Sequence, residues 1–313
     1  MKKIQLGLLD FGKRKSEYSS MGKVLDVIDY AIEADQLGFS RFWLSEHHNF
    51  SREEAWSSPQ MLLPLILSET QRINVGMAGV LLNYYSSYST ATNFKMLANL
   101  FPSRVDLGFA AGTPPMKISQ LLCQNKFDER PNTLPTKLQE ISDFYHAEDE
   151  IAKNDHIIIP PFKGRVPQLY MLSNSFNKTE EALKLKLNIS KSIFHNKFSL
   201  VYQKDTIQQY REKFYNRYGD FPKVSIAFTG VCAETEQKAK NIAKESGYKN
   251  FFNAIIGTPE MFYEQLKEHQ YNFDVDEFIF HDCDPLNSRR IDTLKKLSHT
   301  FNLTKEKSLY NEI

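Results

Sequence analysis

The chain has few cysteines and almost no net charge. These two features limit the cellular compartment and the kinds of partner that we expect for it. Its three cysteines, Cys123, Cys232 and Cys283, lie far apart and show no Cys-x-x-Cys spacing, a pattern that suits reduced thiols in a cytoplasm. The formal net charge is +1 over 313 residues, which gives no support for binding to nucleic acid. We therefore expect a cytoplasmic protein without a nucleic-acid partner.

Long hydrophobic runs are also missing. The apolar stretch from Ile4 to Leu9 ends at Asp10 and is too short for the core of a signal peptide. No other run approaches the roughly 20 apolar residues that a membrane-spanning helix needs. Because linkers and low-complexity tracts are absent too, the sequence predicts a single domain over residues 1–313 with no membrane association.

What the chain does have is a regular alternation of short apolar runs and helical patterns. Eight runs have the length and composition of buried strands, and each is followed by a segment with helical spacing. They cover residues 4–9, 41–45, 72–80, 104–109, 168–172, 188–194, 224–229 and 277–280. Eight such units predict an α/β fold, a (β/α)8 TIM barrel. Residues 113–166, with six prolines and one expected helix at 134–145, predict a long insertion after the fourth strand, which is either an excursion or a substrate lid.

The active site of such a barrel lies where its strands end. On this prediction the residues at that rim are Asp10 and Phe11, Glu46 to Asn49, Ala78 to Asn83, Ala110 to Thr113, Ser173 to Ser175, His195 and His281.

The adjacent histidines His47 and His48 are the most informative residues at the rim. Imidazole titrates near neutral pH, so a histidine pair at a strand end indicates either proton transfer or metal binding. Neighbours on an extended chain point to opposite sides and rarely chelate one ion. The first strand also lacks a His-x-His pattern. We therefore expect no metal site, one functional histidine and one structural histidine.

Two other groups of small or polar residues lie at the rim. Gly76, Ala78 and Gly79 leave one strand end without bulk, which fits either a ligand close to the backbone or simple packing. Ser173, Asn174 and Ser175, followed by Lys178 and Thr179, fit either an anion site or ordinary helix capping. Together with the histidine they describe a shallow site for a planar, partly anionic ligand.

Several motifs in this order resemble the bacterial luciferase-like flavin monooxygenase family, and the similarity covers nearly the whole chain. The motifs are Glu33–Phe39 running into Phe42-Trp43 and Glu46–Asn49, then Ile73–Val80, Arg104–Gly108 and Gly257–Glu260. The resemblance implies a (β/α)8 barrel, reduced FMN as substrate or cofactor, and activation of dioxygen at the flavin.

The resemblance also implies roles for individual residues. His47 matches the catalytic acid/base histidine beside the reactive flavin carbon, and Glu46 and His48 would orient it. Ala78 and Gly79 match a segment that carries a cis peptide under the flavin ring. Ser175 and Lys178, with Asn174 beside them, match positions that hold the flavin phosphate.

The chain departs from the family pattern at two places. No arginine follows the fourth strand, where the sequence reads Phe109-Ala-Ala-Gly112, and Asn83 replaces a frequent proline. A lost arginine contact should weaken FMN binding, because charge-assisted pairs contribute about 1.5–3 kcal/mol. Our hypothesis is that Lys178 supplies the missing charge; the contrary interpretation is that FMN binds only loosely.

These observations leave three functional hypotheses. The first is a monooxygenase that oxidises a small organic substrate with reduced FMN from a separate flavin reductase, because no G-x-G-x-x-G fingerprint follows an expected strand. The second is a non-catalytic flavin-binding or partner subunit, and the third is a deazaflavin-dependent oxidoreductase. Residues 113–166 and the aromatic run at 84–88 are expected to shape the substrate pocket. The resemblance also implies a homodimer.

Overall fold

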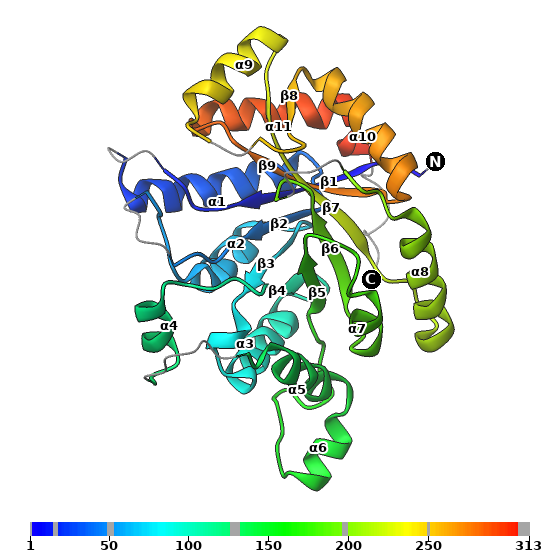
Figure 1. Cartoon of the computed structure of the whole chain (residues 1–313). Coiled ribbons are helices and arrows are strands. Elements are labelled where there is room, and N and C mark those ends of the chain that lie inside the picture. Colours follow the sequence, from blue (N-terminus) through cyan, green and yellow to red (C-terminus); the bar gives the residue numbers. More distant parts are fainter. Residues whose placement is uncertain are drawn as a thin grey trace.

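A closed parallel barrel forms the centre of the computed structural model, which describes residues 2–14, 18–48, 53–125, 132–195, 200–248 and 251–305. The sheet order is β6-β5-β4-β3-β2-β1-β9-β7-β8, and an additional pairing of β6 with β7 closes the ring. The barrel strands are β1 (Gln5–Asp10), β2 (Arg41–Leu44), β3 (Asn74–Val80), β4 (Val105–Phe109), β5 (Gln168–Ser173), β6 (Asn188–Ser192), β7 (Val224–Cys232) and β9 (Glu277–Asp282). This confirms the predicted (β/α)8 barrel and its eight strands (Figure 1).

Helices surround the barrel (Figure 1). They are α1 (Ser20–Gln36), α2 (Leu63–Glu69), α3 (Ser87–Leu100), α7 (Thr179–Lys184), α8 (Lys204–Tyr218), α9 (Glu236–Glu245), α10 (Pro259–Phe273) and α11 (Asn287–Phe301), with the short 3-10 turns η1 (Pro59–Leu62), η2 (Leu82–Tyr84) and η3 (Leu303–Lys305). Within the described part of the chain, no helix has both the length and the apolar character to cross a membrane.

The structure contains three elements that the sequence does not predict: one strand, β8, and two helices, α4 and α6. Strand β8 (Ile255–Gly257) pairs only with the far end of β7, from Gly230 to Cys232, and so stands outside the closed ring. The insertion after β4 carries α4 (Met116–Leu122) and α6 (Glu148–Asn154) in addition to the expected helix, which is α5 (Leu134–His146).

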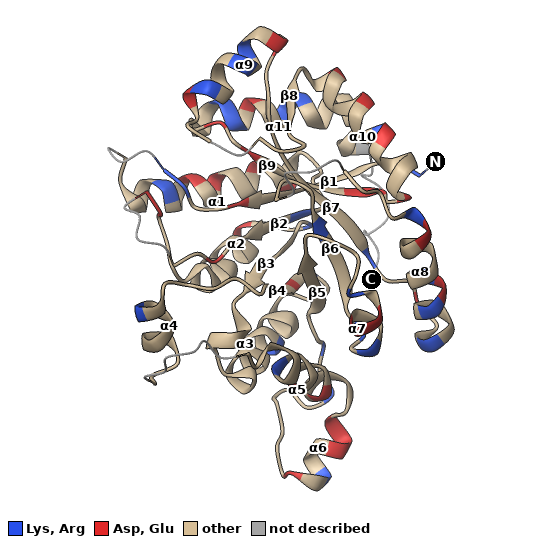
Figure 2. Cartoon of the chain, in the orientation of Figure 1, with Lys and Arg blue, Asp and Glu red and all other residues tan. Residues whose placement is uncertain are grey.

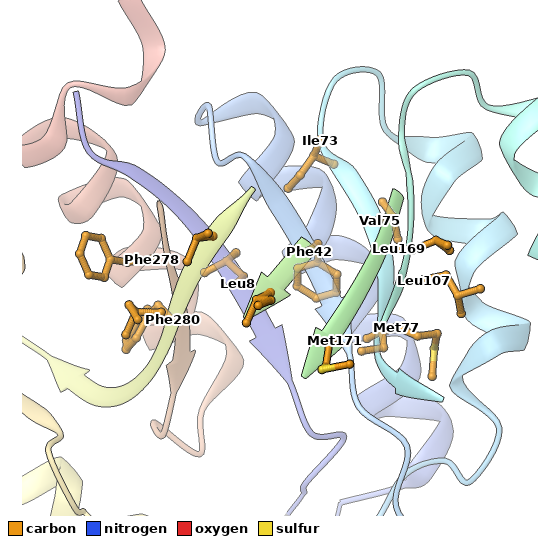
Figure 3. Packing of buried hydrophobic residues seen from close by; sticks show 14 of the residues in the cluster. Leu8, Phe42, Ile73, Val75, Met77, Leu107, Leu169, Met171, Phe278 and Phe280 are labelled. Atoms are coloured by element: carbon orange, nitrogen blue, oxygen red, sulfur yellow. The ribbon is translucent and has the colours of Figure 1, made fainter. Parts of the chain in front are cut away.

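Alternate residues of each strand pack on opposite sides of the barrel wall, as the period of two requires. One set is buried with side chains of α1, α3 and α11 in a layer between strands and helices. Figure 3 labels members of this layer: Leu8, Phe42, Ile73, Val75, Met77, Leu107, Leu169, Met171, Phe278 and Phe280. The other set, including Leu9, Trp43, Tyr170 and Ile279, forms a separate cluster inside the barrel.

Charged residues occupy the barrel interior below this inner cluster. Arg41 donates to Glu277 at 2.7 Å and to Asp106, and its guanidinium lies over the rings of Trp43 and Tyr170 at 5.3 and 5.2 Å. Although burial alone would raise the pKa of Glu277, the charge and hydrogen bond of Arg41 keep it below its usual value. The floor of the barrel is therefore a buried cluster of paired charges, covered by the rings of Trp43 and Tyr170.

Candidate active site

A cavity of about 510 Å³ opens at the carboxyl ends of the barrel strands. Its volume falls within the roughly 300–1,000 Å³ typical of ligand and cofactor sites. Of the residues predicted to have a catalytic or cofactor-binding role, it is lined by Glu46, His47, His48, Ala78, Gly79, Asn174 and Lys178. Ser175 is not part of the lining, and Asn49 lies outside the described residues.

His47 lies directly after β2 and is held by a hydroxyl. Its Nδ1 is 2.8 Å from the Oγ of Ser45, and its ring packs on Phe11 at a centroid distance of 5.4 Å. Burial lowers the pKa of His47 below its ordinary value, although the charges of Glu54 and Glu46 oppose this shift. Because Nδ1 is engaged by Ser45, the neutral ring can exchange a proton with a ligand through Nε2.

Glu46 and His48 form a second hydrogen-bonded group that does not hold His47, in contrast to the role that the resemblance implied. Glu46 Oε1 is 2.7 Å from His48 Nε2 and also accepts from the hydroxyl of Tyr85, while Oε2 accepts from the backbone N–H of Leu81 at 3.2 Å. The reason is the alternation of an extended chain, which puts residues 46 and 48 on one side and residues 45 and 47 on the other. The charge of Glu46 acts on His47 by raising its pKa, against the larger effect of burial.

The end of β3 forms one side of the cavity. The peptide bond between Ala78 and Gly79 is cis, as the resemblance implied, and the β3–β4 register shifts between Met77 and Val80. A Cβ on Gly79 would lie 2.6 Å from Leu172 Cδ1 and 2.7 Å from the carbonyl oxygen of Gly108. The close packing at Gly79 supports the packing interpretation, and its place in the cavity lining leaves the approach of a ligand to the backbone as a prediction.

The loop between β5 and α7, residues 174–178, forms another wall. The N–H of Ser175 donates to Ser173 Oγ at 3.2 Å, and the N–H of Asn177 donates to Ser175 Oγ at 3.4 Å. No side chain caps α7, whose N-cap residue is Lys178. The capping interpretation is therefore wrong for these hydroxyls, which stabilise the loop itself.

The two other rim histidines have different environments. His195, after β6, lines the cavity with its Nδ1 2.6 Å from Ser192 Oγ, and burial followed by the charge of His47 lowers its pKa. His281 is buried, and its Nδ1 is 3.0 Å from the carbonyl oxygen of Leu9. Its ring meets Phe11 edge-on at 4.3 Å, so His281 supports the site without lining it.

Asp10, which the sequence places at the rim, is part of a buried ion-paired group and does not line the cavity. It is buried and pairs with Arg290 at 2.6 Å and Lys23 at 3.3 Å. Burial would raise its pKa, but these two cations lower it well below the usual range. Across the part of the chain that the structure describes, no cluster of three or more His, Cys, Asp or Glu side chains could hold a metal ion.

The insertion after β4 supplies another wall of the cavity. Leu134 and Leu138 of α5 line the cavity. Lys137 of the same helix donates to the carbonyl oxygens that precede α3, those of Leu82, Asn83 and Tyr85, at 3.2, 3.0 and 2.6 Å. Asn83, the residue in place of a frequent proline, accepts from the N–H of Thr133 at 3.0 Å.

The comparison that decides the family covers most of the chain. A family profile described as luciferase-like monooxygenase matches residues 4–276. The chain belongs to the luciferase-like monooxygenase family. It is therefore an oxidoreductase, and the family resemblance drawn from its motifs is confirmed.

Individual relatives agree with this assignment. The chain is 30% identical to the uncharacterized protein YwcH of Bacillus subtilis (strain 168) over 76% of this chain and 71% of that protein. Its structure is similar to apo-MsnO8, with a TM-score of 0.82, 22% identity and coverage of 96% and 99% of the two chains.

A second solved structure was determined with a flavin. It is the oxygenating constituent of 3,6-diketocamphane monooxygenase from Pseudomonas putida in complex with FMN, with a TM-score of 0.71, 16% identity and coverage of 99% of this chain and 100% of that chain. At these identities the two likenesses to solved structures show the shared fold alone.

Proposed function

We propose that this luciferase-like monooxygenase uses reduced FMN and O₂ to oxidise a small organic substrate, and that a separate flavin reductase supplies the reduced flavin. The observation that carries the proposal is the position of His47, fixed at Nδ1 by Ser45, at the edge of a cavity that Ala78 and Gly79 also line. When bound, reduced FMN would supply the electrons that activate O₂.

The volume and the polarity of the cavity suit a flavin. Its remaining walls are largely apolar, with Trp43, Leu81, Phe109 and Phe194 among the lining residues, which suits a planar ring and a small apolar substrate. His47 would hold or move a proton at Nε2, and Leu134 and Leu138 would exclude water from the insertion side. In this arrangement α5 acts as part of a substrate lid.

Lys178 is the cation that we propose for the flavin phosphate. It lines the cavity, its side chain is 54% exposed, and its ion pair with Glu181 is long, at 3.9 Å. Ala110 and Ala111 stand in the cavity wall where an arginine is frequent in relatives. Titration of FMN into the wild type and Lys178→Ala tests this role, and equal affinities would refute it.

The decisive experiment for the function measures oxygen consumption and substrate oxidation with a flavin reductase, NADH and FMN. We expect His47→Ala to bind FMN as the wild type does and to lose at least about a hundredfold in substrate oxidation, the usual range for a general acid or base. Wild-type flavin binding without substrate oxidation would favour the non-catalytic subunit instead. Retention of a deazaflavin in place of FMN would favour the third hypothesis.

We also propose that the protein is a homodimer. Exposed apolar side chains gather on the neighbouring segments η1, α2 and α3, with Met61 70%, Leu65 49%, Met96 50% and Leu100 63% exposed. The one charged residue of α3, Lys95, is buried, so this helix is almost wholly uncharged on its outer face (Figure 2). Exposed apolar side chains beside a helix face without charge suit contact with a second copy of this chain.

A further inference from the structure

Lys191 of β6 is a buried lysine that the proposed chemistry does not use. Its side chain alternates with Ser190 and Ser192, which line the cavity, and therefore points outward from the barrel, where it is only 1% exposed. Its Nζ lies over the rings of Phe176 and Phe273 at 5.2 and 5.3 Å. Burying an ammonium group costs free energy unless the group is paired with an opposite charge and hydrogen-bonded. The burial of Lys191 therefore needs an explanation.

No carboxylate compensates this ammonium among the residues that the structure describes. The hydrogen-bond acceptors of Nζ are neutral: the carbonyl oxygen of Val201 at 2.7 Å and Oε1 of Gln203 at 3.2 Å. Burial lowers the pKa of Lys191 to about 8. At neutral pH the side chain is therefore cationic and leaves a net positive charge behind the cavity wall.

Gln203 connects this charge to the loop at 174–178. Its Oε1 accepts from Lys191 and also from the backbone N–H of Phe176 at 3.3 Å. Its Nε2 donates to Oδ1 of Asn177 at 3.2 Å. Lys191 therefore orients one amide group, and that amide group contacts two consecutive residues of the loop.

We propose that Lys191 is a positioning residue for the flavin phosphate. Lys191 holds the 174–178 loop through Gln203 and supplies positive charge from the side of the loop that faces away from the cavity. The inference rests on the proposed function. It accounts for the missing arginine after β4, because a buried cation in a medium of low dielectric acts at longer range than an exposed one such as Lys178. Lys178 would touch the phosphate from the cavity side, and Lys191 would act through the loop.

The test compares the affinities of oxidised FMN and riboflavin, which differ only in the phosphate. Gln203→Glu is the most informative variant, because it keeps the shape of the side chain and places a carboxylate beside Lys191. Lys191→Met removes the charge and keeps most of the side-chain volume. Lys240→Met on α9, an exposed lysine paired with Glu236, makes the same charge change away from the cavity.

We expect the wild type and Lys240→Met to prefer FMN over riboflavin. In Gln203→Glu and Lys191→Met, FMN binding should weaken about tenfold while riboflavin binding stays unchanged, as loss of a charge-assisted interaction requires. If Lys191→Met fails to fold, Gln203→Glu decides alone.

Equal weakening of both flavins, or an unchanged preference for FMN, would overturn the role of Lys191 and leave the proposed function standing. A wild type that binds neither flavin would overturn the proposed function and this inference with it.

Discussion

At the scale of single residues, the site separates two hydrogen-bonded groups that share one short segment. Ser45 holds His47, while Glu46 holds His48 and Tyr85. Ser45→Ala should lower kcat/KM roughly threefold to tenfold, because one hydrogen bond contributes about 0.5–1.5 kcal/mol. Ser192→Ala, the matched change beside His195, should have the smaller effect, and the reverse order in steady-state assays would contradict the assignment of His47.

His281 predicts how stability depends on pH. Burial lowers its pKa to about 4, although the charge of Asp10 and the bond to Leu9 oppose the shift. The unfolded chain binds this proton near pH 6.5, so the stabilisation by the neutral ring is complete above that pH and is lost as the pH falls toward 4. His281→Gln should reduce the fall in the free energy of unfolding over this range, measured with urea. An unchanged pH dependence of the free energy of unfolding in this variant would contradict the role of His281. His299→Gln, at an exposed position, is the control.

The sequence was sufficient to find the imidazole and carboxylate groups of the site. It did not indicate which hydroxyl groups form hydrogen bonds with them. His47, His48 and Glu46 were recognised because imidazoles beside a carboxylate at a strand end indicate chemistry. Ser45 and Tyr85 carry hydroxyls that occur in many structural roles, so their partners emerged only from the structure. The period of two along an extended chain could have paired 45 with 47 and 46 with 48 in advance.

At the scale of elements, the barrel strands were predictable because strands buried on both faces are continuous apolar runs. Strand β8 has three residues and pairs with one end of β7, which leaves too short a pattern to detect. Helices α4 and α6 have seven residues each, less than the length over which helical spacing becomes distinctive.

The attachment of the insertion to the rim gives a prediction for substrate binding. Lys137 joins α5 to the three carbonyl oxygens before α3, and Leu134 and Leu138 of this helix line the cavity. Lys137→Met should raise KM for the organic substrate severalfold and change FMN affinity little, because the flavin contacts that we propose lie on the barrel strands and the loops after β2 and β5, outside the insertion. Lys153→Met, on the neighbouring α6, is the matched control. An equal loss of FMN affinity would contradict this division of the cavity.

At the scale of the whole molecule, the apolar surface on α2 and α3 determines the expected assembly. Leu65→Glu combined with Met96→Glu should convert a dimer into monomers, because it buries like charges at the contact. Tyr271→Glu on α10, a residue 66% exposed, should leave the assembly unchanged. Light scattering after size-exclusion chromatography measures both, and a monomeric wild type would refute the dimer.

The separation between barrel and insertion has a consequence for evolution. The residues proposed to face the flavin come from the barrel strands and the loops that follow them, whereas Leu134 and Leu138 come from the insertion after β4. Insertions between strands tolerate changes in length and composition better than the strands do. A lineage with this architecture can therefore acquire new substrates by replacing one segment while it inherits the oxidative chemistry intact.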